Sequence, residues 1–187
     1  DKAGTQGFIS RDDSKKEIVV SFRGSMEIKD AWTSMSLTFK AFSVLSNHTL
    51  SDIQLLFTPL SSPGITDVGG AQVHTGFLKA YNVVADEVIS SVRSQLASRP
   101  SYTVVVLVRR PFVLSVRLIL IHPTGHSLGG AVGSLAALSL KYALPNLKLK
   151  LYTYGQPRVG NAAFASLMES RVGVNNIFRA THTYGTM

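Results

Sequence analysis

The chain has 187 residues, of which 45% are hydrophobic, and its net charge is +8. This length predicts one domain with a sizeable buried core. Cysteine is absent, which excludes a disulfide framework and leaves the redox compartment undetermined. A positive net charge is typical of proteins that bind nucleic acid or an anionic membrane. In this sequence, however, the basic residues form no clustered face with stacking aromatic residues, which nucleic-acid binding requires. Half of the net charge comes from four cations in two unusual segments: Lys40, Arg109, Arg110 and Arg117. We therefore expect a solvated surface and no nucleic-acid binding.

The predicted elements alternate between strands and helices. A buried strand is predicted over residues 17–22, followed by a helix over residues 76–98 that Pro100 ends. The helix has one apolar stripe, which we expect in the core: Phe77, Tyr81, Val84, Val88, Val92 and Leu96. Later strands are predicted over 102–106, 147–154 and 176–180, and later helices over 128–143 and 160–171. This alternation predicts a mostly parallel central sheet with helices on both faces, in a single domain over residues 1–187.

A possible nucleophile motif lies between the strand at 102–106 and the helix at 128–143. The pentapeptide is Gly125-His126-Ser127-Leu128-Gly129. A serine nucleophile elbow requires the order strand, sharp turn, helix. The flanking glycines allow strained backbone at the serine and close packing of the helix. The Leu128 N–H at the helix start is then a candidate donor to an oxyanion. The alternative interpretation is a serine-glycine turn without chemistry.

Three further segments accompany this motif in a fixed order. They are Ser21-Phe22-Arg23-Gly24-Ser25 at the end of the first strand, Val73-His74-Thr75-Gly76-Phe77 at the start of the long helix, and Gly155-Gln156-Pro157-Arg158-Val159-Gly160-Asn161 after a later strand. Together with the elbow they resemble the fungal class 3 lipases, which are secreted α/β-hydrolases that include triacylglycerol lipases and feruloyl esterases. The resemblance extends from about residue 7 to residue 183.

The resemblance implies an α/β-hydrolase fold and a carboxylic ester hydrolase of the serine type. Ser127 would be the nucleophile within the elbow residues Gly125, His126 and Gly129, and Ser25 would supply the second oxyanion donor beside Leu128. Neither a metal nor an organic cofactor is required by this chemistry. We expect a lipid or other ester substrate, a lipid–water interface as a place of action, no obligate protein partner, and secretion from the cell.

The resemblance also implies a lid after the oxyanion serine. Ile28 and Trp32 stand four residues apart, so they would share one face of a short helix. In lipases of this family a helix at this place covers the site and opens at lipid interfaces. An ordinary surface turn with one buried tryptophan remains the alternative. His74 and His126 are expected to serve as packing or turn residues.

Two segments interrupt the family pattern, at residues 34–51 and 107–123. Removing the second joins the strand at 102–106 directly to Thr124 and the elbow. An insertion in the strand before a nucleophile would have to loop out of the centre of the sheet. We interpret both segments as translated introns, since codons for Ser34-Met35-Ser36 and Val108-Arg109 can contain fungal donor sites. A membrane span over 102–121 is excluded by proline and three arginines, each costing about 2.5–3.5 kcal/mol at the bilayer centre.

The carboxyl-terminal part departs from the family at the proton relay. Gly185 stands where the resemblance implies the triad aspartate, and after Ser127 only Glu169 and His182 could act as acid or base. We therefore expect a fragment that is incomplete at both ends. Two function classes remain, an ester hydrolase whose triad is completed elsewhere and a catalytically incompetent fragment or pseudoenzyme that binds acyl ligands. Lipid and feruloyl esters are not distinguished, and neither is the oligomeric state.

Overall fold

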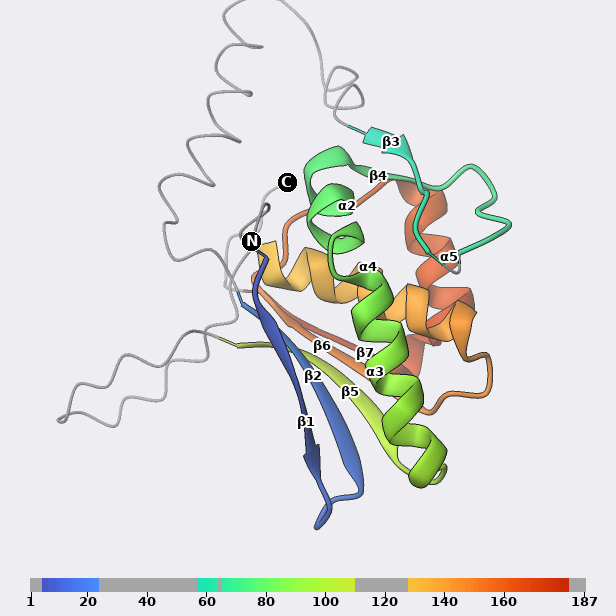
Figure 1. The fold of residues 1–187 in the computed structure, drawn as a ribbon. Coiled ribbons are helices and arrows are strands. Elements are labelled where there is room, and N and C mark those ends of the chain that lie inside the picture. The colour runs from blue at the N-terminus through green and yellow to red at the C-terminus, as the bar shows by residue number, and fades with distance from the viewer. Residues whose placement is uncertain (1–4, 24–56, 64, 110–127, 182–187) are drawn as a thin grey trace, which may run out of the picture.

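A five-stranded, mostly parallel sheet organises the chain (Figure 1). The computed structural model describes residues 5–23, 57–63, 65–109 and 128–181. In spatial order the strands are β1 (Gly7–Asp12), β2 (Glu17–Arg23), β5 (Thr103–Arg109), β6 (Leu149–Tyr154) and β7 (Ile177–Ala180). Only β1 is antiparallel to its neighbour, while β2, β5, β6 and β7 run in the same direction. The expectation of a mostly parallel sheet is confirmed.

The helix predicted after the nucleophile motif forms the centre of the molecule. Helix α4 (Leu128–Ala143) has the predicted bounds, and all its residues from 129 to 140 are buried. It contacts β2, β5 and β6, and it also contacts α2 (Thr75–Asn82), α3 (Ala85–Ser98) and α5 (Ala162–Val172). A helix that is apolar on every side is stable only when other elements surround it. The glycines and alanines of its first half allow these neighbours to approach closely.

The core lies between the sheet and these helices. Alternate residues of the strands face it, because successive side chains of a strand point to opposite faces; they include Ile18, Val20, Phe22, Val104, Val106, Leu149 and Leu151. Helices α3 and α4 contact the sheet directly, and α2 and α5 pack on α4 (Figure 1). All four thus lie on one side. Helices on the second face, which the alternation also predicts, do not occur among the described residues.

The single helix predicted over residues 76–98 is in fact two. Helix α2 ends at Asn82, a turn follows at Val83 and Val84, and α3 begins at Ala85. The apolar stripe is nevertheless core, as expected, with Tyr81 and Val92 fully buried. The sequence pattern does not show this break, because Val84 lies in the turn and still keeps the helical spacing of the apolar residues. Asp86 and Glu87 in the first turn of α3 mark the new start, since acidic groups favour helix amino termini.

The remaining predicted elements agree with the structure to within two residues at most boundaries. The exception is β5, which continues to Arg109 rather than ending at residue 106. Leu107 pairs with Ser21 of β2 and with Tyr152 of β6, so the strand extends into the segment interpreted as foreign. The physical reason is that Leu107 and Val108 continue an apolar, β-branched run whose backbone the neighbouring strands can bond.

Several elements were not predicted. Strand β1 forms the antiparallel edge, β3 (Phe57–Pro59) and β4 (Gln72–His74) form a separate two-stranded sheet, and η2 (Val174–Asn176) is one turn of 3-10 helix. Each is short or largely exposed, so the apolar periodicity is weak. No helix in the described part of the chain has both the length and the apolar character needed to cross a membrane.

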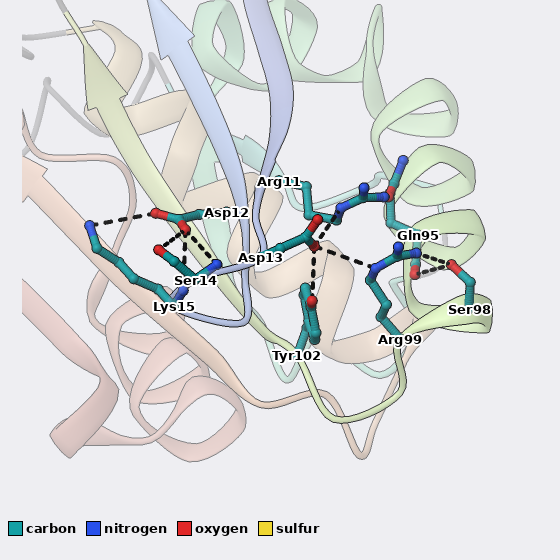
Figure 2. Close-up of polar contacts among 9 residues, drawn as sticks. All are labelled: Arg11, Asp12, Asp13, Ser14, Lys15, Gln95, Ser98, Arg99 and Tyr102. Carbon is teal, nitrogen blue, oxygen red and sulfur yellow. Dashed lines mark hydrogen bonds and ion pairs between the residues drawn. The ribbon is translucent and has the colours of Figure 1, made fainter.

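Polar side chains close the amino end of the sheet, by which we mean the end where β2 and β5 begin (Figure 2). The Asp13 carboxylate accepts a hydrogen bond of 2.8 Å from the Tyr102 hydroxyl. It also pairs with Arg11 at 2.7 Å and Arg99 at 3.5 Å. Asp12 accepts from the backbone N–H and the hydroxyl of Ser14, as in an Asx turn. These contacts join the β1–β2 turn to the connection between α3 and β5.

Candidate functional site

Four parallel strands end together at what we call the carboxyl end of the sheet. Their last residues are Arg23, Arg109, Tyr154 and Ala180. In open α/β sheets, reactive groups gather in loops at this end. Helix α4 begins at Leu128, the residue directly after the predicted nucleophile, and its first turn packs against the segment that follows β6. The described elements therefore bring the start of the elbow helix to the carboxyl end.

Most of the predicted site residues lie outside the described part of the chain. These are the nucleophile Ser127, the elbow residues Gly125 and His126, the oxyanion residue Ser25, and the lid residues Ile28 and Trp32. Leu128 and Gly129 are described, and they are the first two residues of α4. The first four N–H groups of a helix have no acceptor within the helix. The Leu128 N–H is one of these four, as its predicted role requires.

The end of β2 lies beside the end of β5. Arg23, the last residue of β2, pairs in register with Arg109 of the parallel strand β5. The chain therefore leaves β2 toward Ser25 at the same end of the sheet at which α4 begins. The Arg23 backbone N–H donates to the Gln6 carbonyl at 2.8 Å, and its guanidinium donates to the Gln6 side chain. These contacts give Arg23 a structural role, in which it ties the end of β2 to the residue before β1.

The turn after β6 is held between β7 and α4. Gly155 has a left-handed φ of 53°, and its N–H donates to the Ala180 carbonyl at 2.8 Å. The Arg179 guanidinium donates to the Gln156 carbonyl at 2.9 Å. On the other side, a Cβ atom added to Gly130 would lie 3.1 Å from the Gln156 Cβ. The segment between β6 and α5 therefore contacts the first turn of the elbow helix directly.

The two motifs Val73–Phe77 and Gly155–Asn161, which are distant in sequence, contact each other. Gly160 pairs with Val73, and a Cβ atom on Gly160 would lie only 2.4 Å from the Gln72 carbonyl oxygen. The Asn161 side chain accepts hydrogen bonds from Gln72 N–H and from Phe164 N–H, so it caps α5 and holds β4. The sequence motif marked this turn, but only the structure shows that Asn161 joins the small sheet to α5.

His74 caps the amino terminus of α2. Its Nδ1 accepts a hydrogen bond of 3.1 Å from the Gly76 N–H, and its ring lies 4.4 Å from the Phe77 ring, centroid to centroid. Its backbone N–H donates to the Val159 carbonyl at 2.8 Å. Burial lowers the pKa of His74 below its usual value, which favours the neutral form that can accept. The expectation of a packing or turn role is confirmed.

The described residues do not complete a proton relay. Glu169 lies on the exposed side of α5, and its carbonyl accepts from Gly173 N–H at the end of that helix. His182 and Gly185 lie outside the described part, whereas β7, which leads to them, ends at the carboxyl end of the sheet. Within the described ranges no group of three or more histidine, aspartate or glutamate residues could hold a metal ion.

Comparison with known proteins agrees with the resemblance seen in the sequence. The family described as Lipase (class 3) matches residues 19–107 and 116–184. A lipase of Rhizomucor miehei is 36% identical over 169 residues, which cover 89% of this chain and 36% of that protein. The secreted mono- and diacylglycerol lipase 1 of Fusarium solani is 32% identical over 181 residues, covering 97% of this chain and 41% of that protein. This chain thus spans less than half the length of these relatives.

A solved triacylglycerol lipase, whose catalytic centre is described as a serine protease triad, matches with a TM-score of 0.64 and 35% identity. The match covers 95% of this chain and 52% of the other. The fold is therefore that of the α/β-hydrolases. The unmatched residues 108–115 fall inside the predicted insertion at 107–123, while residues 34–51 lie within the matched range. The family match and the shared fold together show that this chain belongs to the class 3 lipase family.

Proposed function

We propose that the protein to which this chain belongs hydrolyses carboxylic esters, with Ser127 as the nucleophile. The observation that carries the proposal is the start of α4 at Leu128, one residue after Ser127, at the end of the sheet where four parallel strands finish. Membership of the class 3 lipase family supports it, as does the triad described for one solved relative. The reaction class is acyl transfer from the ester to the serine and then to water.

In this reaction Ser127 Oγ attacks the ester carbonyl while a histidine takes the hydroxyl proton. The tetrahedral oxyanion is held by the Leu128 N–H and by Ser25, and the alcohol leaves with the proton from the histidine. Water then attacks the acyl-enzyme by the same route in reverse and releases the acid. We infer that the histidine and its orienting aspartate lie in parts of the protein outside residues 1–187, since this chain covers only 36% of the Rhizomucor miehei lipase and 41% of the Fusarium solani lipase.

The second candidate function is acyl-ligand binding without turnover. It is favoured by Gly185, which stands where the family pattern has the triad aspartate. A serine without its base is a poor nucleophile, and removal of triad members leaves only about 10³–10⁴-fold catalysis over water in a well-studied serine protease. Residues 1–187 alone are therefore expected to show no measurable hydrolysis of p-nitrophenyl butyrate.

The test compares residues 1–187 with a longer chain that carries the natural carboxyl-terminal part. The longer chain should hydrolyse p-nitrophenyl butyrate, and Ser127→Ala should abolish that activity. Ser134→Ala on the same helix is the matched control, since the Ser134 hydroxyl donates to the Gly130 carbonyl at 2.9 Å within α4. Activity of the longer chain that survives Ser127→Ala would refute the proposal. If residues 1–187 alone hydrolyse the ester and Ser127→Ala abolishes this activity, then His182 or Glu169 can serve as the base.

For the substrate we propose a lipid ester at a lipid–water interface, with Ile28 and Trp32 in a lid. Relatives named as lipases and as mono- and diacylglycerol lipases support this substrate class. In the active longer chain, Trp32→Ala should lower hydrolysis of emulsified long-chain esters more than that of soluble short ones. Equal losses on both substrates would remove the lid from the proposal. Secretion is proposed on the same basis, because the Fusarium solani relative is named as secreted.

A further inference from the structure

The turn after β6 has contacts on both sides but few backbone bonds of its own. Gly155 is tied to β7 through the Ala180 carbonyl. The next carbonyl, that of Gln156, accepts from the Arg179 guanidinium at 2.9 Å. Pro157 follows, and proline has no N–H to donate and restricts the residue before it. The Arg179 guanidinium is therefore the donor seen for the Gln156 carbonyl, and it ties this peptide to β7.

The same residue also contacts the elbow helix. A Cβ atom on Gly130 would meet the Cβ, Cγ and Cα atoms of Gln156 at 3.1, 3.3 and 3.5 Å. Gln156 thus lies against the first turn of α4, where a larger residue than glycine would push it away. Residues 129–140 of α4, which include most of its first turn, are buried. Its first turn borders the loop after β6, and its later turns border the connection between β3 and β4, where the Ser139 hydroxyl donates to the Pro63 carbonyl at 3.0 Å. The contact with Gln156 is therefore the loop contact that acts on the first turn.

We propose that Arg179 is a positioning residue, which holds the Gln156 peptide against the first turn of α4. The inference rests on the proposed function, in which Ser127 directly precedes that turn and the Leu128 N–H is an oxyanion donor. Arg179 lies one residue before the end of β7, and the chain leaving β7 leads toward the place of the triad acid in the family pattern. Arg179 therefore links the end of β7 to the first turn of α4 through the Gln156 peptide. Because its side chain is exposed, its loss should alter position more than overall stability.

The first measurement is amide hydrogen exchange on the longer chain that carries the natural carboxyl-terminal part. The Val132 and Gly133 N–H groups bond to the carbonyls of Leu128 and Gly129 in a regular helix, so they report opening of the first turn. Arg179→Met should raise their exchange rates about tenfold, in line with loss of a charged hydrogen bond, and leave α3 unchanged. Arg179→Lys should restore part of the protection, because an ammonium group can also donate to a carbonyl.

The control is Arg93→Met, which removes the same charge from an exposed position on α3. Equal exchange at Val132 and Gly133 in the Arg93→Met and Arg179→Met variants would overturn the proposal. Faster exchange in both α3 and α4, without rescue by lysine, would also overturn it, since that pattern reports general destabilisation.

The second measurement is ester hydrolysis by the longer chain with its carboxyl-terminal part. Arg179→Met should lower kcat for p-nitrophenyl butyrate about tenfold and leave KM unchanged, as expected when reacting groups are displaced by a fraction of an ångström. An unchanged kcat would overturn the catalytic part of the inference. If the unsubstituted longer chain shows no activity that depends on Ser127, the proposed function fails, while the exchange rates still decide whether Arg179 holds α4.

Discussion

The two ends of the sheet are built from different kinds of contact. At the amino end, charged side chains meet at the surface, with Asp13 pairing to Arg11 and Arg99 (Figure 2). At the carboxyl end, backbone approaches backbone, and Gly160 leaves no room for a Cβ atom beside Gln72. Exposed ion pairs contribute little to stability because water and salt screen them. Close backbone contacts are not weakened by water or salt, and the backbone cannot move away from an added side chain without disturbing its neighbours. Substitutions at the carboxyl end should therefore have the larger effects on stability.

The largest effect is expected from removing the two segments interpreted as foreign. A chain without residues 34–51 and 107–123, with the natural termini restored, should unfold cooperatively, whereas the chain as it stands should be poorly soluble. In the shortened chain, Thr124-Gly125-His126 would take the places of residues 107–109 in β5, so the strand pairing is retained. The measurement is thermal unfolding followed by circular dichroism, together with soluble yield. Peptides from both segments in the secreted protein would contradict the interpretation.

Gly160→Ala should be the most damaging single substitution at the carboxyl end. The new Cβ would lie 2.4 Å from the Gln72 carbonyl oxygen and 2.8 Å from the Phe164 side chain. Overpacking of this kind costs about 3 kcal/mol of unfolding free energy at the upper end of its usual range. Denaturant unfolding measures it.

The matched control for Gly160→Ala is Gly69→Ala, where a Cβ atom would meet nothing within 4 Å and only the left-handed φ of 55° is unfavourable. Such strain costs about 1 kcal/mol. An equal loss in the two variants would show that the contact with β4 is not rigid.

The sequence predicted the central helix better than the edge of the sheet. Helix α4 begins and ends at the predicted residues. The glycine-rich motif before it marks its start, and a long apolar run marks its length, because a helix buried on all sides is apolar on all sides. Strand β1 has few apolar residues and is largely exposed, so no period-two pattern marks it. The contact of Gly160 with Gln72 joins residues 88 positions apart, and no local pattern contains that information. The break between α2 and α3 was hidden by the apolar stripe, although Asp86 and Glu87 indicate it.

His74 should make stability at the carboxyl end depend on pH. Burial lowers its folded pKa below the unfolded value of about 6.5, so its contribution is complete above that pH. As the pH falls below about 6.5, His74 binds a proton in the unfolded chain but stays neutral in the folded chain, so the free energy of unfolding decreases. His74→Asn keeps a capping acceptor and should reduce the loss of unfolding free energy between pH 7 and pH 5. An unchanged pH dependence would contradict this assignment.

His74→Ala separates capping from titration. It removes the acceptor for the Gly76 N–H, which should cost about 1 kcal/mol at pH 8, where the histidine is neutral in both states. His74→Asn should lose much less at that pH, because asparagine is a favourable cap. Equal losses in the two variants at pH 8 would assign the effect to the ring contact with Phe77 instead.

The smallest effect is expected at the amino end, where Asp13 and Tyr102 can be removed singly and together. The Tyr102 hydroxyl is the main cause of the lowered pKa of Asp13, followed in the same direction by Arg11. The stability that Asp13 contributes is therefore present above its usual pKa and lost as the pH falls through the lower folded value.

Asp13→Asn and Tyr102→Phe should each lower the melting temperature slightly, and less in 1 M salt, where the screening length is about 3 Å. In the double variant the losses should not add, because the two groups share one hydrogen bond of 2.8 Å. Additive losses would show that the ion pairs with Arg11 and Arg99, rather than the tyrosine, hold Asp13. A loss as large as that of Gly160→Ala would mean that the surface network and the close backbone contacts stabilise the two ends of the sheet equally.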